Sequence, residues 1–350
     1  MTRIAVVSAG AIGSSIAADL TEANLDVTII DQWPAHVEAM RSKGLRITMP
    51  DRVLHVDVNA HHVCDLSVLK PTFDVVLMCA KSQDTTWLTH LIEPYLAADG
   101  VLVGVQNSMN DDLLADIVGR DRTMGCAIEL SADLFVPGEV IRNTPRDGTW
   151  LAIGEPDGSL TPRTEMISTV LGHASVVEVT TKIASLKWSK LIANSMSMGL
   201  FGLFGMLNWD ALRLPGIHQI QIALGRETVA VGEALGYDFE PIFGLTAEDF
   251  VGSVDERLSL AVETLMHHVG RESQTAIVVD YKKGRRSEYD FISGLVVRMG
   301  NKTSIETPYN AIVTDLHRHI DRGEIPMEPA NFDRLIARIQ DLESTVPAAQ

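Results

Sequence analysis

The sequence predicts an α/β domain with a mainly parallel sheet, followed by an all-α domain. Hydrophobic strand patterns alternate with helical patterns through the first half of the chain. Helical periodicity replaces this alternation after about residue 180. The length of 350 residues, with 46% hydrophobic residues, suits two domains with sizeable cores. We therefore expect domains at 1–180 and 181–343, followed by a flexible tail at 344–350.

The first predicted element is a hydrophobic strand at Ile4–Val7, which leads through a turn of small residues into a helix at Ala11–Ala23. The turn Ser8–Gly13 matches the G-x-G-x-x-G pattern of dinucleotide-binding domains, except that Ser8 replaces the first glycine. The preceding strand and the following helix supply the context that this pattern requires. The alternative is a strand–helix turn that binds no ligand.

Each position of the turn has a part in binding a pyrophosphate. Gly10 lets the backbone approach a phosphate closely, and Gly13 lets the helix pack on the strand. The N–H groups of Ala11 and Ile12 lie at the positive end of the helix dipole. Together with Ser8, these residues predict the phosphate site of a Rossmann-type domain.

The second strand, Val27–Ile30, ends at an acidic residue. Asp31 lies 18 residues after Gly13, close to the spacing at which an acid binds the ribose hydroxyls of NAD. The 2′-phosphate of NADP would be repelled by this carboxylate, and the nearest downstream basic residue is Arg41. NAD is therefore favoured, with NADP as the other possibility. The alternative for Asp31 is a solvated acid at a strand end.

The rest of the first domain continues the alternation. Two further parallel strands are expected at Val75–Cys79 and Val101–Val105. The expected helices are Ala35–Ser42, Thr85–Ala97, Asp111–Val118 and Thr164–Leu171. The segment Arg46–Val58 is expected to insert extra strands, and Met124–Ile153 to add antiparallel strands to the sheet before a last strand at Ser175–Val179.

The second domain is predicted to consist of helices. They are expected at Ala184–Leu207, Ile217–Leu235, Ser259–Arg271, Asp290–Met299 and Glu306–Asp321. The apolar stretch Leu191–Leu207 is shorter than a membrane span and contains Asn194, so we interpret it as part of a buried helix. No membrane association is expected.

Polar residues follow two of the predicted parallel strands. Lys81 comes shortly after Val75–Cys79, and Asn107 shortly after Val101–Val105. Open parallel sheets bind ligands at the carboxyl ends of their strands, so both side chains would face the cofactor. For Lys81, an ordinary surface lysine is the alternative.

Lys190 and Asn194 are four residues apart and therefore share one face of a predicted helix. That helix is otherwise apolar, so burial of Lys190 would suit it to act as a general acid. Alternatively, its ammonium reaches outward to solvent. Glu288 precedes another predicted helix, and the alternative for this residue is an ordinary acid that caps the helix N-terminus.

Several short motifs, taken in order, resemble those of the ketopantoate reductase family. They are the glycine turn, Cys79–Ser82, Gln106–Met109, Trp188–Leu191 with Asn194, Ser287–Gly294 and Thr307–Asn310. The resemblance spans roughly residues 3–318. It implies a Rossmann domain followed by a helical domain similar to the C-terminal domain of 6-phosphogluconate dehydrogenase.

The resemblance also implies the roles of individual residues. Lys190 would be the catalytic acid, and Glu288 would orient it or hold a substrate hydroxyl. Asn107 and Asn194 would bind near the substrate and the nicotinamide, with Lys81 beside the cofactor. The implied reaction transfers a hydride between the nicotinamide and a 2-oxo acid or 2-hydroxy acid.

The chain departs from the family pattern at positions that contact substrate. Met198 replaces an asparagine and Ala276 replaces a serine, while Asn208 matches a further family asparagine. A site without partners for a substrate hydroxyl gains little by admitting one. Asp31 also replaces the basic residue that suits NADP. We therefore expect an NAD-preferring enzyme for 2-oxo acids with a relatively apolar side chain.

Two other functions remain open at this point. One is a true 2-dehydropantoate 2-reductase that uses NADPH in pantothenate synthesis. The other is a nonenzymatic sensor that binds a nicotinamide cofactor without turnover. The mostly helical second domain could also support a homodimer.

Composition excludes several partners. The net charge of −17 argues against nucleic acid and anionic membranes. Three cysteines without a C-x-x-C pair suggest buried, reduced thiols of a cytoplasmic protein. The histidine pairs lack the spacing of a helical zinc site, so we expect surface histidines and no metal. These pairs are His61 with His62, His267 with His268, and His317 with His319.

Overall fold

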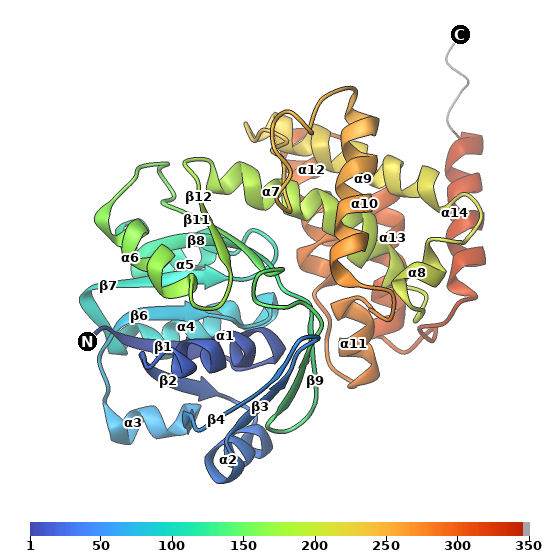
Figure 1. The fold of residues 1–350 in the computed structure, drawn as a ribbon. Coiled ribbons are helices and arrows are strands. Elements are labelled where there is room, and N and C mark those ends of the chain that lie inside the picture. Colours follow the sequence, from blue (N-terminus) through green and yellow to red (C-terminus); the bar gives the residue numbers. More distant parts are fainter. Residues whose placement is uncertain (346–350) are drawn as a thin grey trace. The chain divides into compact units, whose positions relative to one another are not determined.

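The computed structural model describes residues 1–345 and divides into two compact units. The first unit ends at Lys187 and the second begins at Trp188, whereas the sequence suggested a boundary after residue 180. In Figure 1 the sheets of the first unit run from blue to green, and the helices of the second unit are mostly yellow to red.

The first unit contains an eight-stranded sheet with the order β12-β11-β8-β7-β6-β1-β2-β5. Its strands are β1 (Arg3–Val7), β2 (Asp26–Asp31), β5 (Asn59–His62), β6 (Phe73–Met78), β7 (Leu96–Val105), β8 (Thr123–Glu129), β11 (Trp150–Gly154) and β12 (Val176–Val179). Neighbouring strands pair in parallel along the sheet from β8 through β7, β6, β1 and β2 to β5. Strands β11 and β12 are also parallel to each other, and the pair β8–β11 is the antiparallel one. The prediction of a mainly parallel sheet is thus confirmed.

A second, four-stranded sheet has the order β4-β3-β10-β9. Its strands are β3 (Leu45–Thr48), β4 (Val53–Val56), β9 (Ala132–Val136) and β10 (Glu139–Arg142). The prediction that Met124–Ile153 extends the main sheet with antiparallel strands was wrong in part. Strand β8 pairs in parallel with β7, and β9 and β10 join the inserted strands β3 and β4 instead.

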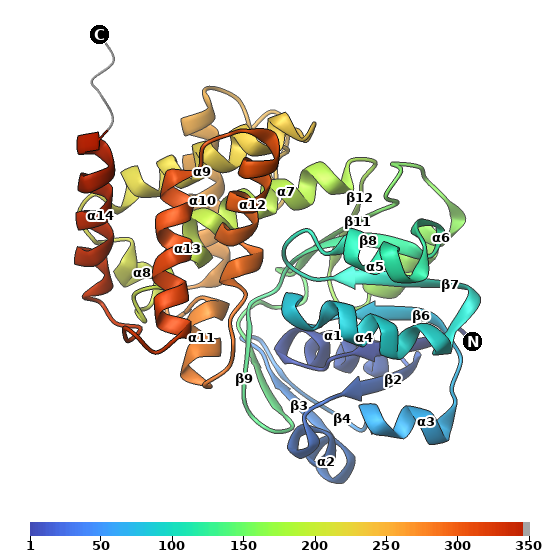
Figure 2. The same ribbon diagram turned by 180° about the vertical axis from the view of Figure 1, so that it is seen from behind.

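Helices cover both faces of the main sheet. They are α1 (Ala11–Glu22), α2 (Pro34–Lys43), α3 (Leu66–Leu69), α4 (Thr85–Ile92), α5 (Asp111–Val118) and α6 (Pro162–Leu171). Helix α1 lies in front of the sheet in Figure 1, whereas α4 lies in front in the opposite view of Figure 2. The predicted helix Thr85–Ala97 was too long, because Pro94 lies in a 3-10 turn and β7 begins at Leu96.

The alternation of side chains along β1 explains this arrangement. Ile4 and Val6 point into one core, which α1 shares with both sheets. Ala5 and Val7 point into the other core, which contains Leu88 of α4. Every residue of β1 after Arg3 is buried, as expected for a central parallel strand.

The second unit consists of helices. They are α8 (Asn208–Ala211), α9 (Ile217–Ala234), α10 (Val254–Val269), α11 (Ala276–Lys282), α12 (Ser293–Thr303), α13 (Pro308–Asp321) and α14 (Asn331–Thr345). Helix α9 contacts α10, α12 and α13, and α14 packs on α13. Helices α8, α11 and α14 were not predicted from the sequence. Helix α10 begins at Val254, five residues before the predicted start at Ser259.

Helix α7 (Ile183–Asn194) runs directly into a π-helical turn, Ser195–Gly199. The expected single helix Ala184–Leu207 therefore changes its winding after Asn194 and gives way to turns beyond Phe201. Turns of this type often occur at functional sites. This one directly follows the two polar residues singled out on α7.

Three smaller expectations concern the C-terminal tail, the cysteines and membrane-spanning helices. The suggested tail 344–350 was wrong for residues 344 and 345, which end α14, and its remainder lies outside the described residues. Cys126 is buried, but Cys64 is exposed, so the expectation of three buried thiols was wrong. No helix within residues 1–345 is long and apolar enough to span a membrane.

Candidate functional site

The turn after β1 adopts the conformation that a glycine usually provides. Ser8 has a φ of 67°, in the left-handed region that L-residues rarely occupy. Its N–H donates to the carbonyl oxygen of Ile30 on β2 at 2.8 Å, which fixes the turn against the neighbouring strand. The serine therefore has the backbone conformation expected of the glycine that it replaces in the pattern.

The two glycines of this turn face different surroundings. A Cβ on Gly13 would lie 2.5 Å from the carbonyl oxygen of Ser8 and 3.1 Å from the Cβ of Cys79, so helix α1 packs closely there. A Cβ on Gly10 would meet no atom within 4 Å, so the space beside Gly10 is open. Gly10 is also the N-cap of α1, and no side chain caps this helix end. The open space and the uncapped N–H groups fit a pyrophosphate.

A buried histidine, His36, supports the turn and was not predicted from the sequence. Gly138 donates its N–H to His36 Nδ1 at 2.9 Å, so the hydrogen of the neutral ring is on Nε2. Nε2 lies 3.1 Å from Ser14 Oγ, which donates in turn to the carbonyl oxygen of Ala9 at 2.7 Å. This chain of hydrogen bonds links α2 and the second sheet to the centre of the turn.

Asp31 ends β2 and is buried, with 4% of its surface exposed. Its Oδ1 accepts the N–H of Trp33 at 2.7 Å. The interpretation of Asp31 as a solvated acid was therefore wrong. Arg41, the nearest downstream arginine, donates to Asp65 at 2.5 Å and to the carbonyl oxygen of Ala60 at 2.9 Å. Its guanidinium thus already has hydrogen-bond acceptors in the protein.

Lys81 and Asn107 follow the ends of β6 and β7, and both side chains are partly exposed. Hydrogen bonds from neighbouring side chains join the loop after β6 to the loop after β7. Gln106 Nε2 donates to the carbonyl oxygen of Ala80 at 2.7 Å, and Asn110 Nδ2 donates to Ser82 Oγ at 2.9 Å.

The four strands β7, β6, β1 and β2 are neighbours in the sheet and all run parallel. The glycine turn, Asp31, Lys81 and Asn107 therefore share the carboxyl edge of one sheet. This is where doubly wound folds bind their ligands.

In the second unit, Lys190 and Asn194 lie one turn apart on α7 and are both buried. The exposed fractions are 5% for Lys190 and 2% for Asn194, so the interpretation of Lys190 as an outward-reaching lysine was wrong. Met198 is partly buried in the π-helical turn that follows.

The other predicted substrate residues lie on three separate segments. Glu288 is buried at the N-cap of a short 3-10 turn, but its side chain makes no capping hydrogen bond, so the capping interpretation was wrong. Ala276 is the partly buried first residue of α11. Asn208 is buried and donates from Nδ2 to Ser273 Oγ at 2.9 Å. That donor therefore links α8 to the segment before α11.

The late motif Thr307–Asn310 holds two helices together. Glu227 on α9 accepts the N–H groups of Tyr309 and Asn310 at 2.7 and 2.9 Å, and Asn310 Nδ2 at 2.8 Å. The carboxylate thereby caps the first turn of α13 from a neighbouring helix. Burial raises the pKa of Glu227 to about 7, although these N–H donors oppose the shift.

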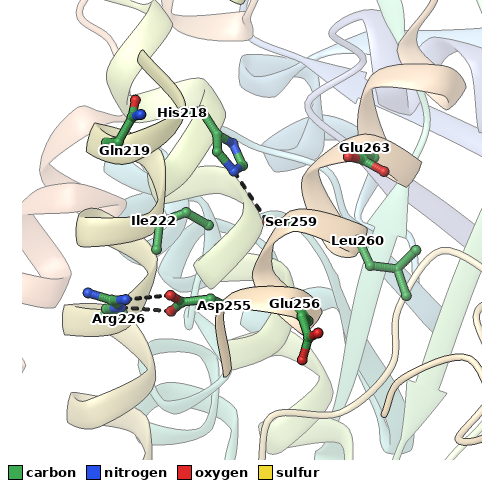
Figure 3. Close-up of a pocket in the computed structure, with 9 residues that line it drawn as sticks. All are labelled: His218, Gln219, Ile222, Arg226, Asp255, Glu256, Ser259, Leu260 and Glu263. Atoms are coloured by element: carbon green, nitrogen blue, oxygen red, sulfur yellow. Dashed lines mark hydrogen bonds and ion pairs between the residues drawn. The ribbon is translucent and has the colours of Figure 1, made fainter. Parts of the chain in front are cut away.

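A pocket of about 520 Å³ lies between α9 and α10. Figure 3 shows the residues that line it, most of which have polar side chains, with Arg226 and Asp255 joined by an ion pair and His218 directed at Ser259. None of the predicted site residues lines this pocket. We assign it no part in the chemistry.

Comparison with known proteins agrees with these observations. Residues 4–157 match the family model "Ketopantoate reductase PanE/ApbA", and residues 182–321 match its C-terminal counterpart. The 2-dehydropantoate 2-reductase of Archaeoglobus fulgidus is 24% identical over 328 residues, which cover 92% of this chain and 98% of that protein.

Solved structures show the same fold. A PanE/ApbA family ketopantoate reductase from Ralstonia eutropha superposes with a TM-score of 0.78 at 24% identity, covering 92% of this chain and 99% of that one. D-mandelate dehydrogenase in complex with NADH and anilino(oxo)acetate gives a TM-score of 0.82 at 17% identity, with the same coverage. The chain belongs to the ketopantoate reductase family, whose members are NAD(P)-dependent oxidoreductases that reduce 2-oxo acids.

Proposed function

We propose that this protein interconverts a 2-oxo acid with a relatively apolar side chain and the corresponding 2-hydroxy acid, with NAD as its preferred cofactor. Lys190 is the proton donor for reduction. The observation that carries this proposal is the burial of Lys190 on helix α7, one helical turn from the amide of Asn194.

The residue types suit the reaction. The nicotinamide, when bound, supplies the hydride that adds to the ketone carbon. As negative charge grows on the ketone oxygen, the Lys190 ammonium stabilises it and delivers a proton, so that a hydroxyl forms and the amine is left neutral. The amides of Asn107 and Asn194 hold the substrate carboxylate and carbonyl at reacting distance. Glu288 orients the ammonium or accepts a substrate hydrogen bond.

The preference for an apolar side chain is supported by two positions. Met198 and Ala276 offer no hydrogen bond where the family pattern has asparagine and serine. A ketopantoate hydroxyl would lose its hydrogen bonds to water there without gaining replacements. A branched or aromatic side chain would instead gain from contact with the methionine.

The preference for NAD is supported by Asp31 and by the contacts of Arg41. A carboxylate at the end of β2 accepts hydrogen bonds from ribose hydroxyls and repels a 2′-phosphate. At the protein surface, Arg41 donates hydrogen bonds to Asp65 and to the carbonyl oxygen of Ala60, and these contacts fix the position of its guanidinium. Both features favour NAD over NADP.

A substrate screen tests these proposals together. Purified protein is assayed with ketopantoate and with branched and aromatic 2-oxo acids that lack its hydroxyl, each with NADH and NADPH. We expect the highest kcat/KM for a 2-oxo acid without the hydroxyl, with NADH. A preference for ketopantoate with NADPH would instead indicate a true 2-dehydropantoate 2-reductase, and binding without any turnover would indicate a sensor.

The role of Lys190 is tested separately. Lys190→Ala should lower kcat by about 10²-fold or more, as expected for the loss of a positioned acid. Lys302→Ala, which removes an exposed lysine from α12, is the matched control and should leave kcat unchanged. Near-normal turnover by Lys190→Ala would disprove the assignment.

A further inference from the structure

The ammonium of Lys190 lies over an aromatic ring that the proposed chemistry does not use. Its Nζ is 4.6 Å from the ring centroid of Phe243. Phe243 is as buried as Lys190, with 4% of its surface exposed. It belongs to the segment between α9 and α10, which contains no helix or strand.

The backbone at Phe243 is strained. Its φ is 61°, in the left-handed region, and Gly244 follows with a φ of 80°. A large side chain at positive φ is unusual and opposes folding, whereas glycine would adopt this conformation readily. Strained residues of this kind persist only where the surrounding structure holds them, and they concentrate at functional sites.

The ring of Phe243 has defined contacts on two sides. Its face is directed at the ammonium, and it meets the ring of His268 on α10 edge-to-face, with centroids 6.1 Å apart. The contact with His268 holds the ring in its orientation. Lys190, Phe243 and His268 all belong to the second unit.

An aromatic face suits a buried proton donor. The negative quadrupole of the ring attracts a cation within about 6 Å, and the attraction strengthens when water is excluded. A carboxylate in the same place would also stabilise the ammonium, but it could accept the proton. The phenyl ring cannot accept a proton, so the ammonium can still deliver one to a substrate.

We propose that Phe243 is a positioning residue for Lys190, and that its ring face holds the ammonium where it protonates the ketone oxygen. This proposal rests on the proposed function, in which Lys190 is the proton donor. It explains why a strained phenylalanine occupies a position that favours glycine. It predicts that replacing Phe243 lowers kcat only when Lys190 is present.

The test compares variants at Phe243 with saturating cofactor and the best 2-oxo acid from the screen. Phe243→Leu keeps apolar volume but removes the ring face, and kcat should fall about tenfold. Phe243→Tyr keeps the ring and should retain kcat within about twofold. The dissociation constant of the cofactor should not change in either variant. If Phe243→Leu does not fold, Phe243→Met replaces it.

A matched control comes from the same segment. Phe239 packs edge-to-face on Phe250 and near the Arg257 guanidinium, so Phe239→Leu removes an aromatic ring without touching Lys190. Its kcat should match that of the wild type. An equal loss of kcat in Phe239→Leu and Phe243→Leu would show a general effect on the segment and would overturn the proposal.

A double-mutant cycle separates this proposal from the proposed function. In a Lys190→Ala background, Phe243→Leu should have almost no further effect on the residual rate, because the cation is gone. The same fold-loss in both backgrounds would overturn the role of Phe243 and leave that of Lys190 intact. Normal turnover by Lys190→Ala alone would instead disprove the proposed function.

Discussion

His317 Nε2 lies 2.7 Å from the carbonyl oxygen of Gly199, the last residue of the π-helical turn. A carbonyl can only accept, so the hydrogen of this neutral ring is on Nε2, and Nδ1 accepts from the Tyr281 hydroxyl at 3.1 Å. The ring also stacks on Tyr289, next to Glu288, at 5.1 Å. His317 is fully buried, so the expectation of a surface histidine was wrong. It supports two segments that carry proposed site residues.

The first prediction concerns the pH dependence that His317 gives to stability. Burial lowers the pKa of His317 from 6.5 to about 4. Between these values the unfolded chain binds the proton and the folded protein does not, so stability falls as the pH falls. The full loss is roughly 3 kcal/mol. Replacing His317 with glutamine should remove this dependence.

Urea denaturation of wild type and His317→Gln at pH 7 and pH 4.5 measures it. The free-energy advantage of the wild type over the variant should shrink at the lower pH. His267→Gln, which removes an exposed histidine from α10, is the control and should follow the wild type. An advantage that stays constant with pH would contradict this prediction.

The second prediction has the opposite sign and concerns Glu227. Its pKa is raised from 4.5 to about 7 by burial. Between these values the folded protein binds the proton and the unfolded chain does not, so stability falls as the pH rises. Glu227→Gln should therefore gain stability relative to wild type between pH 5 and pH 8. Thermal denaturation at both pH values, with the exposed residue Glu233 on α9 changed to Gln as control, would show it. An equal difference at both pH values would argue against a buried, titrating carboxyl.

The third prediction distinguishes the two glycines of the phosphate turn. Gly13→Ala should destabilise the protein, because the new Cβ would lie 2.5 Å from the backbone oxygen of Ser8. Gly10→Ala should leave the melting temperature nearly unchanged, because its Cβ meets no atom within 4 Å. It should nevertheless weaken cofactor binding by about tenfold or more, since the methyl group would enter the space proposed for the pyrophosphate. Unchanged cofactor affinity in Gly10→Ala, measured by NADH fluorescence, would exclude this turn as the phosphate site.

The fourth prediction concerns the choice of cofactor. Asp31→Arg should raise the ratio of kcat/KM with NADPH to that with NADH, because it replaces a repelling carboxylate with a phosphate-binding guanidinium. Asp26→Arg makes the same charge change at the exposed start of β2 and is the control. If Asp26→Arg changes the ratio as much as Asp31→Arg does, the effect comes from net charge. A wild type that already prefers NADPH would refute the argument from the ribose.

The sequence determined the order of the first strands and helices and the edge of the sheet where the candidate cofactor residues gather. Hydrophobic runs such as that of β1 have a strong local signal, and a parallel sheet brings the ends of such strands together. Ser8, Gly10 and Gly13 could be recognised because the turn depends on backbone geometry that only small residues allow. Lys190 and Asn194 could be paired because helical spacing relates residues four apart.

Only the tertiary structure decided what surrounds these residues. The partition of the short strands between two sheets depends on pairing between segments far apart in the chain, such as β3 with β10. The contacts of Lys190 with Phe243 and of His317 with Gly199 join residues more than 50 positions apart. No local pattern specifies such contacts, because they form only when distant helices pack together. The sequence thus identified the candidate groups for the proposed chemistry, and the packing of the helices decided how those groups are held.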